Sequence, residues 1–555
     1  MGTWLALANG MRPSPAAFGL TCALLAAACQ GGGAGSDPEC SGDKCDDLGG
    51  GSDEVTLCAA VRGNGQRIPA HFASLARIVE HYGPLDAIAG GSSGSITSFL
   101  YESISSNPNT IQCGVAACSS SQRAERIAFL LKSLQGTLEL LAQSPEVQAL
   151  GDLAKLVAEV KAQGIEELAA EDVEAAREAL LAILESDELG PLVNPELLEL
   201  LTSSPDPEMH VRDIAGAIGS LGSFAAPTAL ELVRPGVIDF ERFADLIGRI
   251  AGFYAGYGSA YDQHAMESLL ADCAPASRGM VWSQAAAVAA AEGATCGARF
   301  AAMLTAYRGA VDSSTPNRAD DPIGARLPVL VMTSVVEGAG AAEMARAQAA
   351  YRAAQVPTLA IDFDDVRVGY FGQKADLERV AGNPRGFADL KTKKFLALGE
   401  RSWREVLSYS PAEPGLARAL ELAGGSGSYS AGGWPDLHPV QVLENLGCDQ
   451  VVYVTRQGGE SRFAQGVASV LGMSAAEGEE LYDLAGKSGF AAALERAGAV
   501  WCTDWDGVGG DLESLAANAY NAPMETSQAF FADGAGAYPA AQSGLGVVGC
   551  TPGAH

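Results

Sequence analysis

Basic residues are scarce in this chain. Lysine and arginine together number 36 against 67 aspartates and glutamates, which gives a formal net charge of −31 over 555 residues. Sequence-independent binding of nucleic acid depends on basic side chains that neutralise phosphates, so this composition excludes nucleic acid as an expected partner. The same acidity repels the chain from an anionic bilayer unless a further group anchors it there.

The sequence also lacks the spacings that hold metal ions. No two C-x-x-C pairs occur, and the six histidines are scattered along the chain. Structural and catalytic zinc sites need such ligands at short, regular spacings. We therefore expect neither a metal site nor a cofactor.

A long hydrophobic run is missing as well. The apolar segment from Ala16 to Ala28 follows Arg12 and is shorter than the roughly 20 residues that a transmembrane helix needs. Its charge and length are typical of a secretory signal, so residues 1–28 are predicted to be a signal peptide. The small residues before Cys29 resemble a bacterial lipobox, which predicts lipidation of Cys29; ordinary signal cleavage nearby is the alternative. We expect export to the periplasm or cell surface, as an outer-membrane lipoprotein.

Twelve cysteines agree with export, because disulfides persist in oxidising compartments. When Cys22 leaves with the signal and Cys29 carries lipid, an even number remains. The close spacings suggest the pairs Cys40/Cys45, Cys113/Cys118 and Cys273/Cys296, which leaves Cys58, Cys448, Cys502 and Cys550 for longer closures. The connectivity stays open at this stage.

One short motif indicates chemistry: Gly90-Gly91-Ser92-Ser93-Gly94. An apolar run, Leu85–Ala89, precedes it and a helix-like run, Ser95–Tyr101, follows. A serine in a tight strand-to-helix turn presents its hydroxyl, and the crowded turn requires small neighbours such as Gly90 and Gly94. This context makes Ser92 a candidate nucleophile.

A glycine loop precedes this motif, after the predicted strand 55–61. Glycines at 63 and 65 allow the backbone amides of Gly63, Asn64 and Gly65 to converge on one point, and the helix predicted from Pro69 to His81 adds a positive dipole end. The loop is therefore a candidate oxyanion site. The alternative is a turn that binds no ligand.

Strand and helix patterns alternate along the folded part, which predicts an α/β fold with a parallel sheet. Further buried strands are predicted at 327–332, 358–363 and 451–454. Residues 29–53 are polar and glycine-rich, so we interpret them as a disordered tether. Helical periodicity fills 121–310 and predicts an inserted helical subdomain, with a lid as the alternative. The α/β domain then comprises 54–120 and 311–555.

The stretch from Leu57 to Tyr101 resembles the start of the patatin-like phospholipases. In that family a strand leads to a G-G-G-x-R-G loop, a helix with an early histidine, a second strand and G-x-S-x-G. The corresponding residues here are Gly63-Asn64-Gly65-Gln66-Arg67-Ile68, His71 and Ser92, with Asn64 and Ile68 in place of family glycines. Similarity resumes at 327–333, 408–412 and 440–454. The resemblance implies a mostly parallel sheet flanked by helices, and it gives His71 a structural role.

The resemblance also implies a Ser-Asp dyad, whose aspartate lies in a D-G-G or D-G-A turn. The matching turn here is Ala431-Gly432-Gly433, and a methyl group accepts no proton. Asp436, five residues later, and Asp506, in a local Asp-Gly, are alternative bases. His438 offers a third possibility, a Ser-Asp-His triad.

These patterns lead to three functional hypotheses. The first is a secreted, membrane-anchored serine acyl hydrolase that cleaves lipid carboxylic esters through an acyl-enzyme on Ser92. The second is a catalytically inactive relative that binds lipid or acts as a scaffold, because Ala431 replaces the dyad aspartate. The third is a structural surface lipoprotein whose helical segment is the working part.

Overall fold

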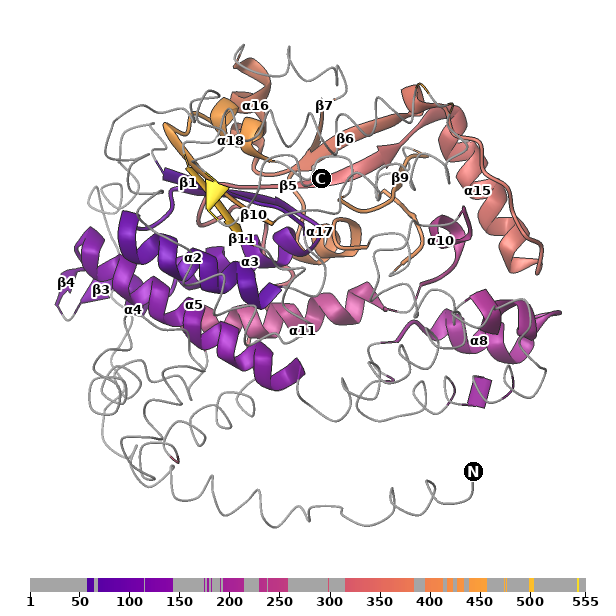
Figure 1. Ribbon diagram of the computed structural model, residues 1–555, viewed down its shortest axis with the longest axis horizontal. Helices are drawn as coiled ribbons and strands as arrows, with labels where there is room; N and C mark the ends of the chain where they lie inside the picture. The colour runs from indigo at the N-terminus through magenta and orange to yellow at the C-terminus, as the bar shows by residue number, and fades with distance from the viewer. Residues whose placement is uncertain are drawn as a thin grey trace, which may run out of the picture. The chain divides into compact units, whose positions relative to one another are not determined.

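The computed structural model describes residues 57–63, 68–113, 115–142, 193–213, 229–236, 238–257, 315–383, 395–412, 417–422, 427–433, 439–456, 499–503 and 547–548, together with positions 174, 177, 178, 181, 190, 298, 474 and 476. All of them belong to one compact unit, Glu54–His555. Within these residues the chain is a mixed α/β protein with a mostly parallel central sheet flanked by helices (Figure 1).

The described residues form a sheet of ten strands, with the order β12-β11-β10-β1-β2-β5-β6-β7 along its main path. All neighbours from β12 to β5 are parallel, whereas β6 and β7 run antiparallel to β5 and parallel to each other. The strands of this path are β1 (Leu57–Val61), β2 (Ala87–Gly91), β5 (Val329–Val336), β6 (Val366–Phe371), β7 (Phe395–Gly399), β10 (Gln450–Arg456), β11 (Ala499–Thr503) and β12 (Val547–Val548).

Two short strands continue the sheet beyond the end of β2. Strand β9 (Tyr429–Ser430) pairs antiparallel with Val335 and Val336 at the end of β5, and with β8 (Leu420–Glu421) on its other side. Strand β2 pairs with β5 only as far as Gly91 and Met332. The chain that follows β9 is therefore brought to the point where β2 ends.

Helices cover both faces of the sheet. In β1 the side chains of Leu57, Ala59 and Val61 join a core with α2 (Ile68–Tyr82), α3 (Ser93–Ser105), α5 (Ser120–Ala142) and α11 (Phe240–Gly252). The alternate side chains, Cys58 and Ala60, face a second core with α16 (Lys374–Gly382) and α18 (Val440–Leu446). This two-residue alternation is inherent to a strand. Because both faces are covered, the central strands are continuous apolar runs.

The remaining described elements complete this arrangement. They are α4 (Pro108–Ile111), the antiparallel pair β3 (Gln112–Cys113) and β4 (Ala116–Ala117), α8 (Pro195–Ser203), α10 (Ala229–Val233), the π-helical turn η4 (Phe253–Tyr257), α15 (Gly338–Arg352), the 3-10 turn η6 (Phe363–Asp365) and α17 (Trp403–Tyr409). Helices α10 and α15 cover a third apolar cluster at the β5 and β6 end of the sheet.

The segment predicted to be a helical insertion, 121–310, contributes to the main core where it is described. Residues Ile127, Leu130 and Leu134 of α5 and Ile247 of α11 are buried in the same cluster as α2 and α3. Two isolated bridges, Val193 with Ile238 and Gly236 with Ala417, also occur within it or at its edge. These helices thus help to cover one face of the sheet.

The strand predicted at 358–363 is wrong. Residues 355–362 are described and form no strand, and the strand lies later, at β6. Leu359 and Ile361 are buried in the third apolar cluster, whereas Thr358 and Ala360 are exposed. An extended segment that lies across a core shows the same alternation as a strand, without a ladder of backbone hydrogen bonds.

Two disulfides join described residues. Cys113 and Cys118, a pair suggested by their spacing, are bonded across the β3–β4 turn. Cys58 in β1 is bonded to Cys448, which follows α18, so two of the cysteines left for longer closures pair with each other. Cys29 and the predicted pairs Cys40/Cys45 and Cys273/Cys296 lie outside the described residues.

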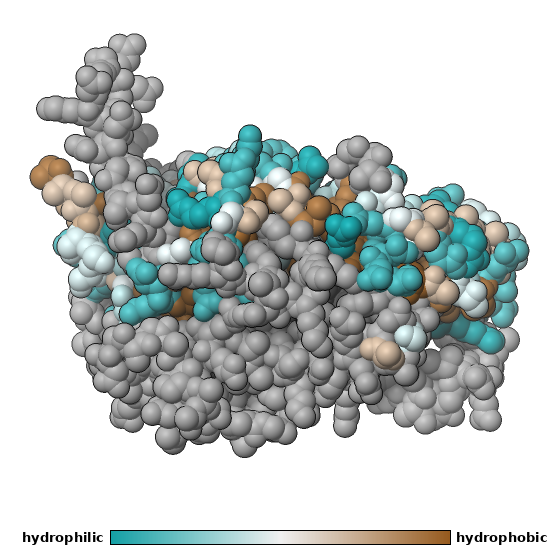
Figure 2. Space-filling view, turned by 90° about the horizontal axis from the view of Figure 1, so that it is seen from above, coloured by the Kyte–Doolittle hydropathy of each residue, from teal (hydrophilic) through white to brown (hydrophobic). Residues whose placement is uncertain are grey.

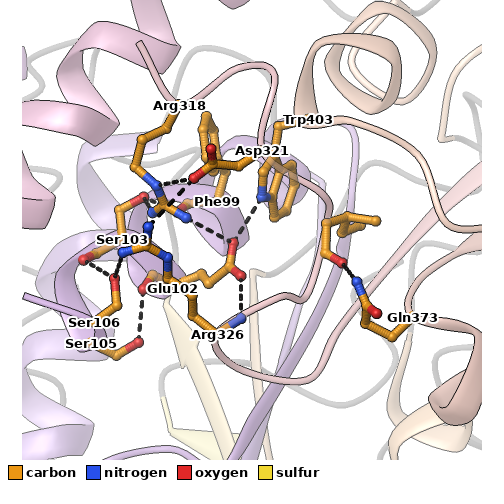
Figure 3. Close-up of polar contacts among 11 residues, drawn as sticks. Phe99, Glu102, Ser103, Ser105, Ser106, Arg318, Asp321, Arg326, Gln373 and Trp403 are labelled. Atoms are coloured by element: carbon orange, nitrogen blue, oxygen red, sulfur yellow. Dashed lines mark hydrogen bonds and ion pairs between the residues drawn. The ribbon is translucent and has the colours of Figure 1, made fainter. Parts of the chain in front are cut away.

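A buried carboxylate connects α3 to α17 (Figure 3). The Glu102 side chain accepts hydrogen bonds from the Trp403 indole (2.8 Å) and from the Arg326 backbone N–H (3.1 Å). Arg318 lies 3.9 Å from the same carboxylate and forms an ion pair with Asp321 at 2.8 Å. Burial raises the pKa of Glu102, and the positive charge of Arg318 opposes this shift. The cluster fixes residues 315–326 and α17 against α3.

The face seen in Figure 2 shows hydrophilic residues interspersed with smaller hydrophobic areas in its described part. Among the described residues, the exposed large hydrophobic side chains are Ile111, Val115, Leu198 and Val356. Within the same part of the chain, none of the helices has both the length and the hydropathy required to cross a membrane.

Candidate nucleophile site

Ser92 lies in the sharp turn between β2 and α3. Its backbone angles are φ 51° and ψ −127°, and Ala354 is the one other described non-glycine residue with positive φ. Such conformations are costly for L-residues and persist only where surrounding structure holds them. A strained strand-to-helix turn is the geometry that the G-x-S-x-G motif predicts for a nucleophile.

The residues around Ser92 must be small because neighbouring backbone atoms lie close to them. A Cβ placed on Gly90 would lie 2.6 Å from the carbonyl oxygen of Gly94. One placed on Gly94 would lie 2.5 Å from the carbonyl oxygen of Val61, in the neighbouring strand. Both glycines of the motif are therefore needed for α3 to start directly over the sheet.

The hydrogen bonds of Ser92 engage its backbone. Its N–H donates to the Ser410 hydroxyl at 3.0 Å, and its carbonyl accepts from the backbone N–H (2.9 Å) and the hydroxyl (2.6 Å) of Ser95. Among the described residues no base bonds to the Ser92 hydroxyl, although the residue is only 4% exposed. Because Ser410 occupies the Ser92 N–H, that amide is not available to stabilise an oxyanion.

The end of β1 lies against Ser92. A Cβ on Gly63 would approach the Ser92 Cβ to 2.8 Å and the Gly91 carbonyl oxygen to 2.9 Å. Gly63, one of the three predicted oxyanion donors, is thus adjacent to the candidate nucleophile. Asn64, Gly65 and Arg67 lie outside the described residues.

The turn after β9 contacts Ser92 from another side. A Cβ on Gly433 would lie 2.6 Å from the Ser92 backbone nitrogen, and Gly432 adopts a φ of 86° that favours glycine. The Gly432 carbonyl accepts the Ser334 N–H at 2.6 Å, and the Ala431 N–H donates to the Ser334 hydroxyl at 2.9 Å. The turn Ala431-Gly432-Gly433 therefore reaches the turn that carries Ser92.

Ala431 itself faces the apolar interior. It is buried in the third apolar cluster, together with Val336 of β5 and Ala419. Its methyl group offers no acceptor for a proton from Ser92. The position of Ala431, in the turn next to Ser92, therefore supplies no group that could take part in acid–base chemistry.

Buried hydroxyl groups connect β5, β9 and the end of α17 next to the turn that carries Ser92. The Thr333 hydroxyl lies 2.5 Å from that of Ser430, and the Ser430 hydroxyl donates to the Tyr409 carbonyl at 3.3 Å. Ser410 donates to the Met332 carbonyl at 2.7 Å. Such fully bonded buried hydroxyls favour one arrangement of the three segments.

His71 connects α2 to α3, the helix that follows Ser92. Its Nδ1 lies 2.9 Å from the Thr97 hydroxyl, which also donates to the Ser93 carbonyl at 3.2 Å. Burial lowers the pKa of His71 to about 3, so the ring is neutral at physiological pH. The contacts are those of a buried residue that orients two helices.

The remaining predicted residues of the site cannot be placed. Asp436, His438 and Asp506 lie outside the described residues. The sequence did not indicate Ser410 as a partner of Ser92. Nor did it indicate the approach of Gly433.

No group of three or more histidine, cysteine, aspartate or glutamate side chains suited to a metal ion occurs among the described residues. Comparison of the chain with models of protein families, with curated proteins and with solved structures found no match.

Proposed function

We propose that this chain is a secreted, patatin-like serine acyl hydrolase that cleaves carboxylic esters of lipids. The observation that supports this best is the strained backbone of Ser92, with Gly63 and Gly433 in contact with the same residue. A serine with no special task does not need this conformation, which costs roughly 1–3 kcal/mol. The patatin-like form of the fold, the helical insertion and the preference for lipid esters rest on the sequence resemblance.

The reaction would proceed in two steps. The Ser92 hydroxyl attacks the ester carbonyl while a base takes its proton, and the alcohol leaves as the acyl-enzyme forms. Water then attacks the acyl-enzyme and releases the fatty acid. The amides of Gly63, Asn64 and Gly65, aided by the N-terminal dipole of α2, are the proposed oxyanion donors.

Asp436 is the stronger candidate base on chain reach. It follows Gly433 by three residues, which span at most about 11 Å when extended, and Gly433 contacts Ser92. Asp506 also follows a described position, Thr503, by three residues, but β11 lies three strands from β2, roughly 14 Å away. His438 would serve as the base if Asp436 oriented its ring.

A membrane anchor on Cys29 completes the proposal and explains how an acidic protein could stay at a lipid surface. Fractionation tests it, because the wild type should sediment with membranes after export. A Cys29→Ala variant should move to the soluble fraction. Equal membrane association of both proteins would contradict the anchor.

A catalytically inactive lipid-binding or scaffold protein is the second candidate. The observation that favours it is the buried methyl group of Ala431 in the turn beside Ser92. Loss of a dyad base lowers the rate by several orders of magnitude unless another group replaces it.

A fluorophosphonate probe and a fluorogenic short-chain ester distinguish the two candidates. The active protein should be labelled and should hydrolyse the ester, and Ser92→Ala should abolish both. Ser98→Ala is the matched control, because this buried hydroxyl of α3 bonds only to the Gly94 carbonyl among described residues and should leave both signals intact.

The same assay identifies the base. Asp436→Asn should lower ester turnover by about 10³-fold or more, and Asp506→Asn should have little effect. A folded wild type that is neither labelled nor active supports the inactive alternative.

A further inference from the structure

Ser410 stands at the C-terminal end of α17, where its buried hydroxyl makes two hydrogen bonds. It donates to the Met332 carbonyl of β5 at 2.7 Å and accepts from the Ser92 N–H at 3.0 Å. Met332 is the register partner of Gly91, the residue before Ser92. One bond of this hydroxyl thus ends at the turn that carries the candidate nucleophile, and the other ends at the β5 residue paired with the last residue of β2.

The Ser92 N–H needs such a partner from outside its own elements. It lies beyond the last residue of β2 and before the first residue of α3, so neither the strand ladder nor the helix supplies an acceptor. A buried donor without a partner is unfavourable. The Ser410 hydroxyl satisfies this donor and holds the backbone at positive φ.

Helix α17 is itself held against α3, the helix that Ser92 precedes. Trp403 at its start stacks on Phe99 of α3 with ring centroids 4.5 Å apart and donates to Glu102 (Figure 3). A capping box of Ser402 and Glu405 fixes the first turn of α17. One end of α17 is therefore attached to the body of α3 and the other end to the turn before it.

We infer that Ser410 is a positioning residue for Ser92. This inference rests on the proposed function. It assigns Ser410 the task of holding the Ser92 backbone in the conformation that presents the Ser92 hydroxyl to an acyl ester. By occupying the Ser92 N–H, Ser410 also leaves oxyanion stabilisation to the amides that follow β1. Ser410 itself touches no reacting atom.

The test compares full-length Ser410→Ala with Ser410→Thr, which retains a hydroxyl, and with Ser408→Ala as a matched control. Ser408 lies in the same helix, and its hydroxyl donates to the Arg404 carbonyl rather than to the turn. Two quantities are measured for each folded protein. These are the rate constant for labelling by a fluorophosphonate, and the hydrogen exchange of the peptide that contains Ser92.

We expect Ser410→Ala to label about 10- to 100-fold more slowly, as loss of a partner to a buried donor predicts, and to exchange faster in the Ser92 peptide. With an ester substrate the loss should fall mainly on kcat, since the residue does not touch the substrate. Ser410→Thr should recover most of the rate, and Ser408→Ala should match the wild type in both measurements.

Wild-type labelling and exchange in Ser410→Ala would overturn the inference. If Ser410→Ala does not fold, Ser410→Cys replaces it in the test, because a thiol is similar in size to a hydroxyl but is a weaker donor and acceptor. An unchanged labelling rate in Ser410→Cys counts against the inference. A wild type that is not labelled refutes the proposed function instead. The exchange comparison then still decides whether Ser410 holds Ser92.

Discussion

Ser92 keeps its positive φ because backbone segments from three parts of the chain leave it little room. The chain just after β1 contributes Gly63, the turn after β9 contributes Gly433, and the residue that ends α17 contributes the Ser410 hydroxyl. The strain of about 1–3 kcal/mol is thus held by contacts that have no spare volume. Small changes at these contacts should therefore alter the position of Ser92.

Gly433→Ala is the sharpest of these changes. Its Cβ would lie 2.6 Å from the Ser92 nitrogen and 3.2 Å from the Gly91 carbonyl carbon, so the backbone must move. We expect a destabilisation of about 1–3 kcal/mol in urea unfolding, and fluorophosphonate labelling at least about tenfold slower. Gly382→Ala is the control, because a Cβ there meets nothing within 4 Å. Labelling of Gly433→Ala at the wild-type rate would contradict the close approach.

His71 makes the fold sensitive to acid. Its pKa is about 3 when folded and 6.5 when unfolded, so below pH 6.5 the unfolded chain binds a proton that the folded chain excludes. Stability is therefore present above pH 6.5 and is lost as the pH falls towards 3. Between pH 7 and pH 5 this contribution amounts to about 2 kcal/mol.

Replacing His71 with Gln should lower stability at pH 7 and flatten its decline towards pH 5. Urea unfolding at both pH values measures this, with His210→Gln as a comparison, since burial also lowers the pKa of His210 but the negative charges of Asp213 and Asp206 oppose that shift. Equal acid sensitivity of wild type and His71→Gln would show that His71 is protonated in the folded state.

At the scale of elements, the Glu102 carboxylate is the main polar connection between α3 and α17. Glu102→Gln replaces one acceptor oxygen with an amide that faces an N–H donor, either the Trp403 indole or Arg326. We expect a loss of about 1–3 kcal/mol in urea unfolding. Glu378→Gln, which removes an exposed contact with Lys374, should change stability by less than about 0.5 kcal/mol. If Glu102→Gln and Glu378→Gln lost similar stability, the buried cluster around Glu102 would not be needed for the stability of the fold.

The central strands and the first helix could be predicted from the sequence because continuous apolar runs between turn residues leave few alternatives. Strands β1, β2, β5 and β10 and helix α2 lie within a few residues of their predicted positions. The prediction of a strand at 358–363 failed because alternating buried and exposed side chains indicate that one side of the segment is buried, not that its backbone is paired. Strands β6 and β7 were missed, and β6 contains a glycine, Gly369, in its interior.

The candidate site was only partly predictable, for a related reason. Ser92 and Gly63 belong to local motifs, so their chemistry can be inferred from neighbours in the sequence. Ser410 is separated from Ser92 by 318 residues, and its role depends on how α17 packs against α3. No local pattern encodes such a contact.

At the scale of the whole molecule, the Cys58–Cys448 disulfide closes a loop with a sequence separation of 390 residues, against 5 for Cys113–Cys118. The chain-entropy model assigns about 6 kcal/mol to the first and about 2 kcal/mol to the second. We expect Cys58→Ala/Cys448→Ala to lower the urea midpoint far more than Cys113→Ala/Cys118→Ala. Equal shifts would indicate that strain or residual structure, not loop closure, decides the effect.

Strand β1 lies between β2 and β10 in the sheet, and β10 is among the last described strands in sequence. At a synthesis rate of about 5–20 residues per second, β10 leaves the ribosome roughly 20–80 s after β1. Throughout that interval one edge of β1 has no neighbour, so the turn that carries Ser92 cannot reach its final form until β10 has been made. A chain built in this order keeps its central sheet incomplete until β10 has been made, which would suit the proposed export, since a chain must stay unfolded while it passes through a translocation channel.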